Sequence, residues 1–170
     1  MLVMRTVGGV HPYLDVLGAL NRARVRYVVV GGVAVALQGH LRATVDLDIV
    51  LDLVPDNTRN AIDALTAIGL QPRLPVAASD FANEEIRQAW VDQRNLIVFS
   101  MWNPKNAAVE VDLFAAPPIE PSELIGSADL LPLGDIVVPV ASRHHLIAMK
   151  KIAGRPQDLA DIAALTDGLA

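Results

Sequence analysis

An alternating segment at positions 44–52 constrains this chain more than any other part of its sequence. Apolar and acidic side chains take turns along it, in the order Val45, Asp46, Leu47, Asp48 and Ile49. Because successive side chains of a strand point to opposite faces, this order predicts a half-buried strand. Its wet face carries Asp46 and Asp48, about 6–7 Å apart at a rise of about 3.3 Å per residue.

Two carboxylates held this close repel each other, and a divalent cation between them removes the repulsion. Mg²⁺ prefers hard oxygen ligands and keeps water or phosphate oxygens in its other positions. Asp46 and Asp48 are therefore candidate ligands of Mg²⁺, or of Mn²⁺ in its place. The alternative is that the pair lies on the solvated face of a strand, which is the commoner reason for an isolated Asp-x-Asp.

A pair of glycines precedes this strand. Positions 25–30 form a short β-branched run, predicted to be a buried strand, and a short helix is expected at 33–38. Gly31 and Gly32 separate the two, and glycines there let backbone N–H groups approach a phosphate at the N-terminus of a helix. The pair is thus a candidate phosphate-binding turn, although tight turns also use glycine for conformational reasons.

A second acidic pair, Glu110 and Asp112, lies on a strand expected at 108–114, which forms a hairpin with 96–101. Both acids share one face, so either one can supply a third carboxylate. Asp112 is preferred, because the apolar pair that follows it would anchor a central strand, and Glu110 stays an alternative.

The remaining segments alternate between helical and extended patterns. Helices are expected at 11–24, 55–68, 79–91, 142–153 and 156–165, and a further strand at 136–140. Pro139 suggests that this strand lies at a sheet edge. The pattern predicts a mixed α/β fold in a single domain, residues 1–170, with a core at about 25–140 and a helical tail at about 142–168.

Composition narrows the classes of function. The chain has 170 residues and no cysteine, which excludes disulfides and thiolate zinc sites and fits the cytoplasm. Its 14 basic residues against 19 acidic ones argue against a large basic face for nucleic acid. No apolar run approaches the ~20 residues of a membrane-spanning helix, so we expect no membrane association.

The order of strand, Gly-Gly turn, short helix, Asp-x-Asp strand and later acidic strand resembles the nucleotidyltransferase superfamily with the DNA polymerase β-like core. Residues 31–39 (GGVAVALQG) and 42–48 (RATVDLD) look like its minimal bacterial members, the MNT and AbiEii-like group. The tail at 146–161 (LIAMKKIAGRPQDLAD) is similar to the helical tail of that group. The resemblance covers about residues 25–165.

This resemblance implies transfer of a nucleoside monophosphate from an NTP with release of pyrophosphate. It assigns Asp46 and Asp48 to two metal ions and Asp112 to the ion near the attacking hydroxyl, with Gly31 and Gly32 at the phosphates. Two such ions clamp the attacking and leaving oxygens of an in-line displacement. Further candidates for nucleotide binding are Arg42, Thr44, Lys150 and Arg155.

Lys150 is the cation that the tail would offer to the triphosphate. It borders the apolar stripe of its helix, whereas Lys151 points away, and a lysine beside a cleft suits phosphate. The alternative is a salt-bridged surface helix in which Asp158 and Asp161 pair with Arg155.

The resemblance leaves the acceptor open among an RNA such as a tRNA end, a protein and a small molecule. It implies the toxin half of a toxin–antitoxin pair, with an antitoxin as partner. The alternative function is a catalytically inactive module of the same fold that binds a nucleotide or a partner. The aliphatic excess and low charge are compatible with a dimer, but no interface signature specifies one.

Overall fold

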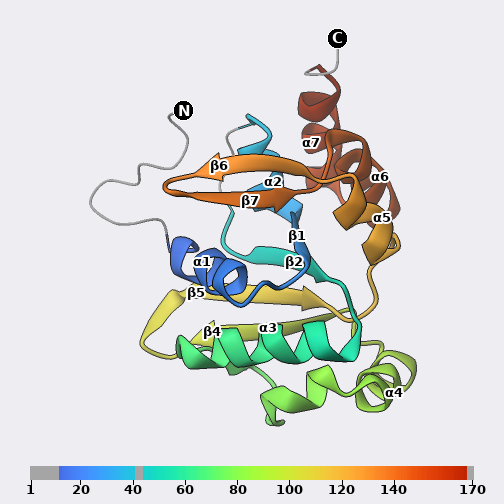
Figure 1. Ribbon diagram of the computed structural model, residues 1–170. Helices are drawn as coiled ribbons and strands as arrows, with labels where there is room; N and C mark the ends of the chain where they lie inside the picture. The colour runs from blue at the N-terminus through green and yellow to red at the C-terminus, as the bar shows by residue number, and fades with distance from the viewer. Residues whose placement is uncertain (1–11, 41–43, 168–170) are drawn as a thin grey trace.

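The computed structural model describes residues 12–40 and 44–167, and its centre is a seven-stranded mixed sheet in the order β3-β4-β5-β2-β1-β7-β6 (Figure 1). The strands are β1 (Tyr27–Val30), β2 (Leu47–Leu51), β3 (Gln71–Pro72), β4 (Val98–Asn103), β5 (Asn106–Phe114), β6 (Asp129–Leu133) and β7 (Ile136–Val140). The mixed α/β class expected from the sequence is therefore confirmed.

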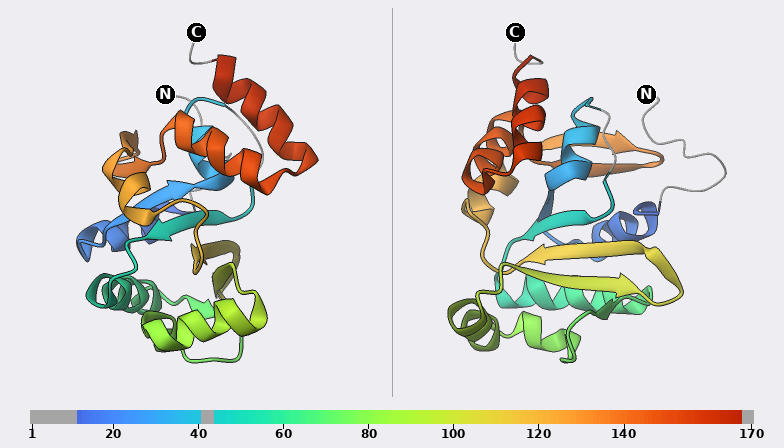
Figure 2. Two further views of the ribbon diagram at one scale, coloured as in Figure 1. Left: turned by 90° about the vertical axis from the view of Figure 1, so that its right-hand side faces the viewer. Right: turned by 180° about the vertical axis from the view of Figure 1, so that it is seen from behind.

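Helices cover both sides of this sheet (Figures 1 and 2). They are α1 (Leu14–Arg22), α2 (Gly31–Leu37), α3 (Pro55–Ala67), η1 (Ala78–Ala82), α4 (Glu84–Arg94), α5 (Pro121–Gly126), α6 (Arg143–Ala153) and α7 (Pro156–Asp167). The views show α1 and α3 on one side and α2, α6 and α7 on the other. No helix within the described residues is long and apolar enough to cross a membrane.

The core is mainly aliphatic, with a stacked group of Phe81, Phe99 and Trp90, and it lies on both sides of the sheet. Leu47 and Ile49 of β2 are fully buried, as are Val111 and Leu113 of β5. Because the acids of both strands alternate with these residues, their side chains emerge on the opposite face of the sheet. Val45 departs from the expected alternation, since it precedes β2 and is 73% exposed.

Strand pairing at the centre of the sheet fixes the position of the acids. β1 and β2 pair antiparallel with Val30 opposite Asp48, and β2 and β5 pair parallel with Asp48 opposite Asp112. The end of β1, the start of the Gly31 turn and two acidic strands thus meet at one place, although they are distant in sequence.

Two expectations about individual elements are wrong. β7 is not an edge strand: it lies between β1 and β6, and its contact with β1 is a single parallel bridge between Val29 and Val140, which leaves room for Pro139. The helix expected at 79–91 is divided into η1 and α4, because the Asn83 side chain accepts a hydrogen bond from the Ile86 N–H and starts a new helix.

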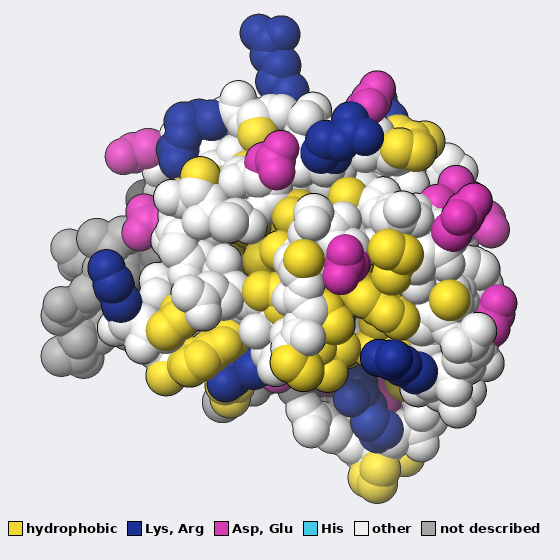
Figure 3. All heavy atoms as spheres, turned by 90° about the horizontal axis from the view of Figure 1, so that it is seen from below, with side chains coloured by type: hydrophobic (Ala, Val, Ile, Leu, Met, Phe, Trp, Pro, Cys, Tyr) yellow, Lys and Arg dark blue, Asp and Glu magenta, His cyan; other side chains and the backbone are white. Residues whose placement is uncertain are grey.

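The underside of the molecule in Figure 1 carries charges of both signs. Figure 3 shows exposed hydrophobic side chains near the middle of this face, with Lys, Arg, Asp and Glu scattered around them. This face lacks a continuous basic field, as the acidic balance of the sequence suggests.

Candidate active site

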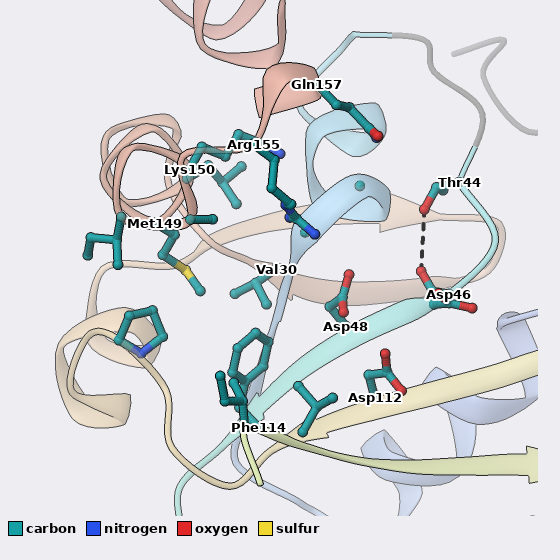
Figure 4. Close-up of a pocket in the computed structure, with 18 of the residues that line it drawn as sticks. Val30, Thr44, Asp46, Asp48, Asp112, Phe114, Met149, Lys150, Arg155 and Gln157 are labelled. Atoms are coloured by element: carbon teal, nitrogen blue, oxygen red, sulfur yellow. Dashed lines mark hydrogen bonds between the residues drawn. The ribbon is translucent and has the colours of Figure 1, made fainter. Parts of the chain in front are cut away.

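The wet face of β2 and β5 forms the floor of a pocket of about 870 Å³ (Figure 4). Its walls come from the Gly31–Gly32 turn, from α6 and from the start of α7. Asp46, Asp48 and Asp112 all line it, so the structure brings together the three acids that the sequence singled out.

Asp48 lies deepest of the three acids and is the most perturbed. Burial, followed by the nearby charges of Asp112 and Asp46, raises the pKa of Asp48 from 3.8 to about 7. Burial and the other carboxylates also raise the pKa of Asp46 and of Asp112. A cluster that disfavours its own negative charge in this way is a candidate site for a cation.

Asp112 and Glu110 have different surroundings, although both are on β5. Asp112 faces the pocket and accepts a hydrogen bond of 2.5 Å from the Ser100 hydroxyl on β4. Glu110 instead accepts from Arg73, with 2.7 Å between Oε2 and Nη2, and it does not line the pocket. Arg73 also lies over the Trp102 ring, 4.1 Å from its centroid. The geometry therefore favours Asp112 as the third carboxylate.

Gly31 lies against Asp48 so closely that a side chain does not fit between them. A Cβ at this position would lie 2.0 Å from Asp48 Oδ2, and the backbone has a φ of +67°, which L side chains rarely adopt. The glycine thus allows the β1–α2 turn to approach the acid. Gly32 is buried and also lines the pocket. The helix to which it belongs, α2, has only seven residues.

Lys150 and Arg155 hold different places around Asp158. Lys150 is buried, and its Nζ lies 2.6 Å from Asp161 and 3.3 Å from Asp158. Arg155 donates to Asp158 from its backbone N and its Nε at 3.0 Å, but its side chain is 73% exposed and points into the pocket beside Asp48 (Figure 4). Lys151 is exposed, as expected.

Two hypotheses for the tail follow from the sequence, a lysine that faces the phosphates and a salt-bridged surface helix, and the arrangement contains features of both. Salt bridges join α6 to α7, yet both cations also lie near the acids, because the charges of Arg155 and Lys150 partly offset the rise in the pKa of Asp48. Arg155 is the more accessible of the two cations.

Two candidates lie on the segment that leads into β2. Thr44 lines the pocket, and its hydroxyl donates to the Asp46 carbonyl at 3.4 Å. Arg42, the other candidate, lies outside the described residues. The Tyr13 hydroxyl donates to the Val45 carbonyl and so ties α1 to the same segment.

The donor set suits a divalent cation, but it is not assembled into a metal site. Within residues 12–40 and 44–167, no group of three or more His, Cys, Asp or Glu side chains is placed to hold a metal ion. Asp46, Asp48 and Asp112 nevertheless offer carboxylate oxygens to one pocket. Burial first, and neighbouring carboxylates second, raise the pKa of each, and a bound cation would offset both effects.

Sequence reasoning missed three residues at or near this pocket. Gln157 lines it from the start of α7. Ser100, on the neighbouring strand, donates a hydrogen bond to Asp112, and Arg73 forms an ion pair with Glu110, which does not line the pocket. The hairpin expected from 96–101 and 108–114 placed Ser100 and Asp112 on neighbouring strands without fixing their register, and the two-residue β3 shows no sequence pattern that would indicate Arg73.

Comparisons with known proteins identify the family and the fold. A profile of the family described as "Nucleotidyl transferase AbiEii toxin, Type IV TA system" matches residues 16–168. Among solved structures, that of ANT(2")-Ia in complex with adenylyl-2"-tobramycin is similar, with a TM-score of 0.58 and 13% identity over 92% of this chain and 86% of that chain. At this identity the likeness shows the fold alone. No match was found among curated proteins. Because the profile covers most of the sequence, the chain belongs to the AbiEii family of nucleotidyltransferase toxins.

Proposed function

We propose that this protein transfers a nucleoside monophosphate from an NTP to the hydroxyl of an acceptor, with Asp46, Asp48 and Asp112 as ligands of Mg²⁺ or Mn²⁺. One observation carries the proposal: strand register sets Asp48 beside Asp112, and Gly31 closes against Asp48. The acceptor is an RNA, a protein or a small molecule, and an antitoxin is the expected partner of a toxin of this family.

The residues of the pocket divide the work of an in-line displacement. The acceptor hydroxyl gives up its proton to solvent as its oxygen attacks the α-phosphorus, the bond from this phosphorus to the bridging oxygen breaks, and pyrophosphate leaves with the bonding electron pair. Bound divalent cations would supply charge neutralisation at the attacking and leaving oxygens. Asp46, Asp48 and Asp112 would hold these cations, and the Ser100 hydroxyl donates to the Asp112 carboxylate, which faces the pocket.

The phosphates lie between the Gly31–Gly32 turn and Arg155 in this proposal. The backbone of the turn lines the pocket next to Asp48, and the Arg155 guanidinium points into the space beside the same acid. Lys150 adds positive charge from behind, while its ion pairs with Asp158 and Asp161 keep α7, and hence Arg155, in place.

The test is transfer of label from α-labelled NTPs to total RNA and total protein, with Mg²⁺ or Mn²⁺. We expect Asp46→Asn and Asp48→Asn each to lower transfer by about 100-fold or more, because each removes a carboxylate from the cation site. Asp56→Asn is the control, because Asp56 is exposed on α3 and distant from the pocket. Transfer that survives in Asp48→Asn contradicts the proposal, and NTP binding without transfer supports the inactive binding module.

A further inference from the structure

We propose that the apolar half of the pocket holds the nucleobase by packing alone, without side-chain hydrogen bonds to the edge of the base. The enzyme then prefers purine over pyrimidine nucleotides by ring size, and treats adenine like guanine and cytosine like uracil. This inference rests on the proposed function and adds the basis of nucleotide selection at the same site.

The pocket has two halves of different chemistry. In Figure 4, Val30, Phe114 and Met149 lie on one side of the Arg155 guanidinium, and Thr44 and Asp46 lie on the other. We define the apolar half as the apolar lining residues contributed by β1, α6, and the β4 and β5 strands with their adjoining loops: Val30, Ile97, Val98, Phe114, Ala116, Pro118, Leu146, Met149, Ile152 and Ala153. Val45, the other apolar lining residue, is next to Thr44 and Asp46 in the sequence.

The position of the phosphates directs the base into this apolar half. Arg155 and the Gly31 turn are at the boundary between the halves, next to Asp48. Asp46 and Thr44 occupy the polar side, so a nucleotide with its phosphates at the boundary has its base either in the apolar half or among carboxylates. Apolar packing favours the first, because the flat faces of a base are poorly hydrated compared with a carboxylate cluster.

No side chain in the apolar half can read the edge of a base. All ten residues named for it lack a side-chain hydrogen-bond donor or acceptor of ordinary strength. Gln157, which carries an amide, lies on the far side of Arg155 in Figure 4. Sites that hydrogen-bond a group on their substrate reject an analogue without it by factors of about 10⁴, whereas apolar pockets discriminate far less.

Two exposed isoleucines in the pocket lining make the affinity for a nucleotide depend on the size of its base. Ile97 is 59% exposed and Ile152 is 63% exposed, and both line the apolar half. A base bound there covers them, and a two-ring purine covers more apolar surface than a one-ring pyrimidine. Since affinity grows with the apolar area removed from water, purine nucleotides gain more from the same walls.

Equilibrium binding in the presence of Mg²⁺ tests this inference on the full chain. The probes are the α,β-methylene analogues of ATP, GTP, CTP and UTP, together with inorganic tripolyphosphate, which has no base. We expect the purine analogues to bind roughly 3- to 10-fold more tightly than the pyrimidine analogues, and each pair with the same ring system to agree within about 2-fold. A preference above about 20-fold within such a pair overturns the inference.

Variants of the apolar wall distinguish the contribution of the base to binding from that of the phosphates. Met149→Ala is expected to weaken the purine analogues by about 5-fold and to leave tripolyphosphate unchanged. Ile152→Ala repeats the test at an exposed position where folding is not at risk. Leu130→Ala, an exposed residue of β6 outside the pocket, is the matched control and should change nothing.

The outcomes distinguish this inference from the proposed function. If Met149→Ala and Ile152→Ala leave nucleotide binding unchanged, or weaken tripolyphosphate as much as the nucleotides, the base lies elsewhere and the inference fails. Transfer that depends on Asp48 is unaffected by that result. If none of the four analogues binds, the proposed function fails as well.

Discussion

At the scale of single residues, the distance between Gly31 and Asp48 is the most demanding feature of the site. The glycine has a φ of +67°, and the space where its Cβ would be is filled by the Asp48 carboxylate. The glycine therefore satisfies two requirements at once, one of its own backbone and one of a side chain on the neighbouring strand.

Gly31→Ala is expected to abolish nucleotidyl transfer, because the new methyl group must displace Asp48. Gly69→Ala is the matched control: Gly69 has a φ of +95° but nothing within 4 Å of the added carbon. Both variants carry the backbone strain, about 1 kcal/mol of unfolding free energy, and only Gly31→Ala moves the acid. Thermal unfolding and transfer rates measure the two effects separately, and an active Gly31→Ala protein would contradict the close approach.

Asp48→Asn should stabilise the metal-free protein at high pH. The pKa of Asp48 is about 7 in the fold and 3.8 in its unperturbed state, so folding favours the protonated carboxyl. Its contribution to stability is complete below pH about 4 and is lost as the pH rises to about 7. We expect the variant to exceed wild type by roughly 2–4 kcal/mol above pH 7 and to match it at pH 4.

Unfolding by denaturant with EDTA, from pH 4 to pH 8, measures this difference. Asp56→Asn is the control for loss of a carboxylate outside the pocket, because the Asp56 side chain is 91% exposed. A stability difference that stays constant over the whole range is incompatible with a raised pKa.

Residue patterns predicted the acids better than their partners. Asp46 and Asp48 were recognisable because alternation places them on one face of a strand whose other face, at Leu47 and Ile49, is apolar. The neutralisation of Glu110 by Arg73 was not recognisable, since it depends on the pairing of the two-residue β3 with β4. Long-range pairing of this kind leaves no local periodicity.

At the scale of elements, the register between β2 and β5 selects one acid of β5. We expect Asp112→Asn to reduce transfer by about 100-fold or more and Glu110→Gln to change it less than about 5-fold, because only Asp112 is opposite Asp48. Transfer rates at saturating Mg²⁺ compare these two isosteric variants. Equal losses would show that both acids serve the site.

The junction of α6 and α7 depends on a buried lysine. Lys150→Met removes the cation that contacts Asp158 and Asp161 and leaves negative charge buried, so we expect a loss of about 3 kcal/mol of unfolding free energy. Lys151→Met, at the exposed neighbouring position, should stay within about 0.5 kcal/mol of wild type. Denaturant unfolding compares the two, and similar values would mean that the ion pairs do not hold the junction.

Elements with a strong period were predicted and short ones were not. α3, α6 and α7 show helical periodicity, and their observed bounds lie within a few residues of the expected ones. α5 has only six residues, and β6 is mostly exposed and contains Pro132, so neither presents a regular apolar face. The edge position expected for β7 failed because β6 covers it.

At the scale of the whole molecule, the pocket joins the central sheet to the helical tail. β2, the residue before it and β5 supply the acids, while α6 and its junction with α7 supply the cations, and α6 supplies much of the apolar wall. The sequence indicated these parts and the mixed α/β class, but the strand order β5-β2-β1-β7 joins segments up to about a hundred residues apart. Such an order follows from packing of the complete chain rather than from any single segment.

Mg²⁺ should stabilise the folded protein as a whole. A cation that binds only the folded state adds about 2.7 kcal/mol at 100 times its dissociation constant, and it also relieves repulsion among the three acids. We expect the melting temperature of wild type to rise by a few degrees with Mg²⁺ and that of Asp48→Asn to rise much less. An equal rise in both proteins, measured by calorimetry at pH 7.5, would place the cation elsewhere.

The contact between Gly31 and Asp48 also has an evolutionary consequence. Positions 31 and 48 share one small volume, so a lineage that keeps the acid cannot acquire a side chain at 31. A descendant that has lost the acid is released from that restriction, and position 31 becomes free to drift. A bulky residue at this position in a homologous sequence would therefore indicate a protein that has lost nucleotidyl transfer.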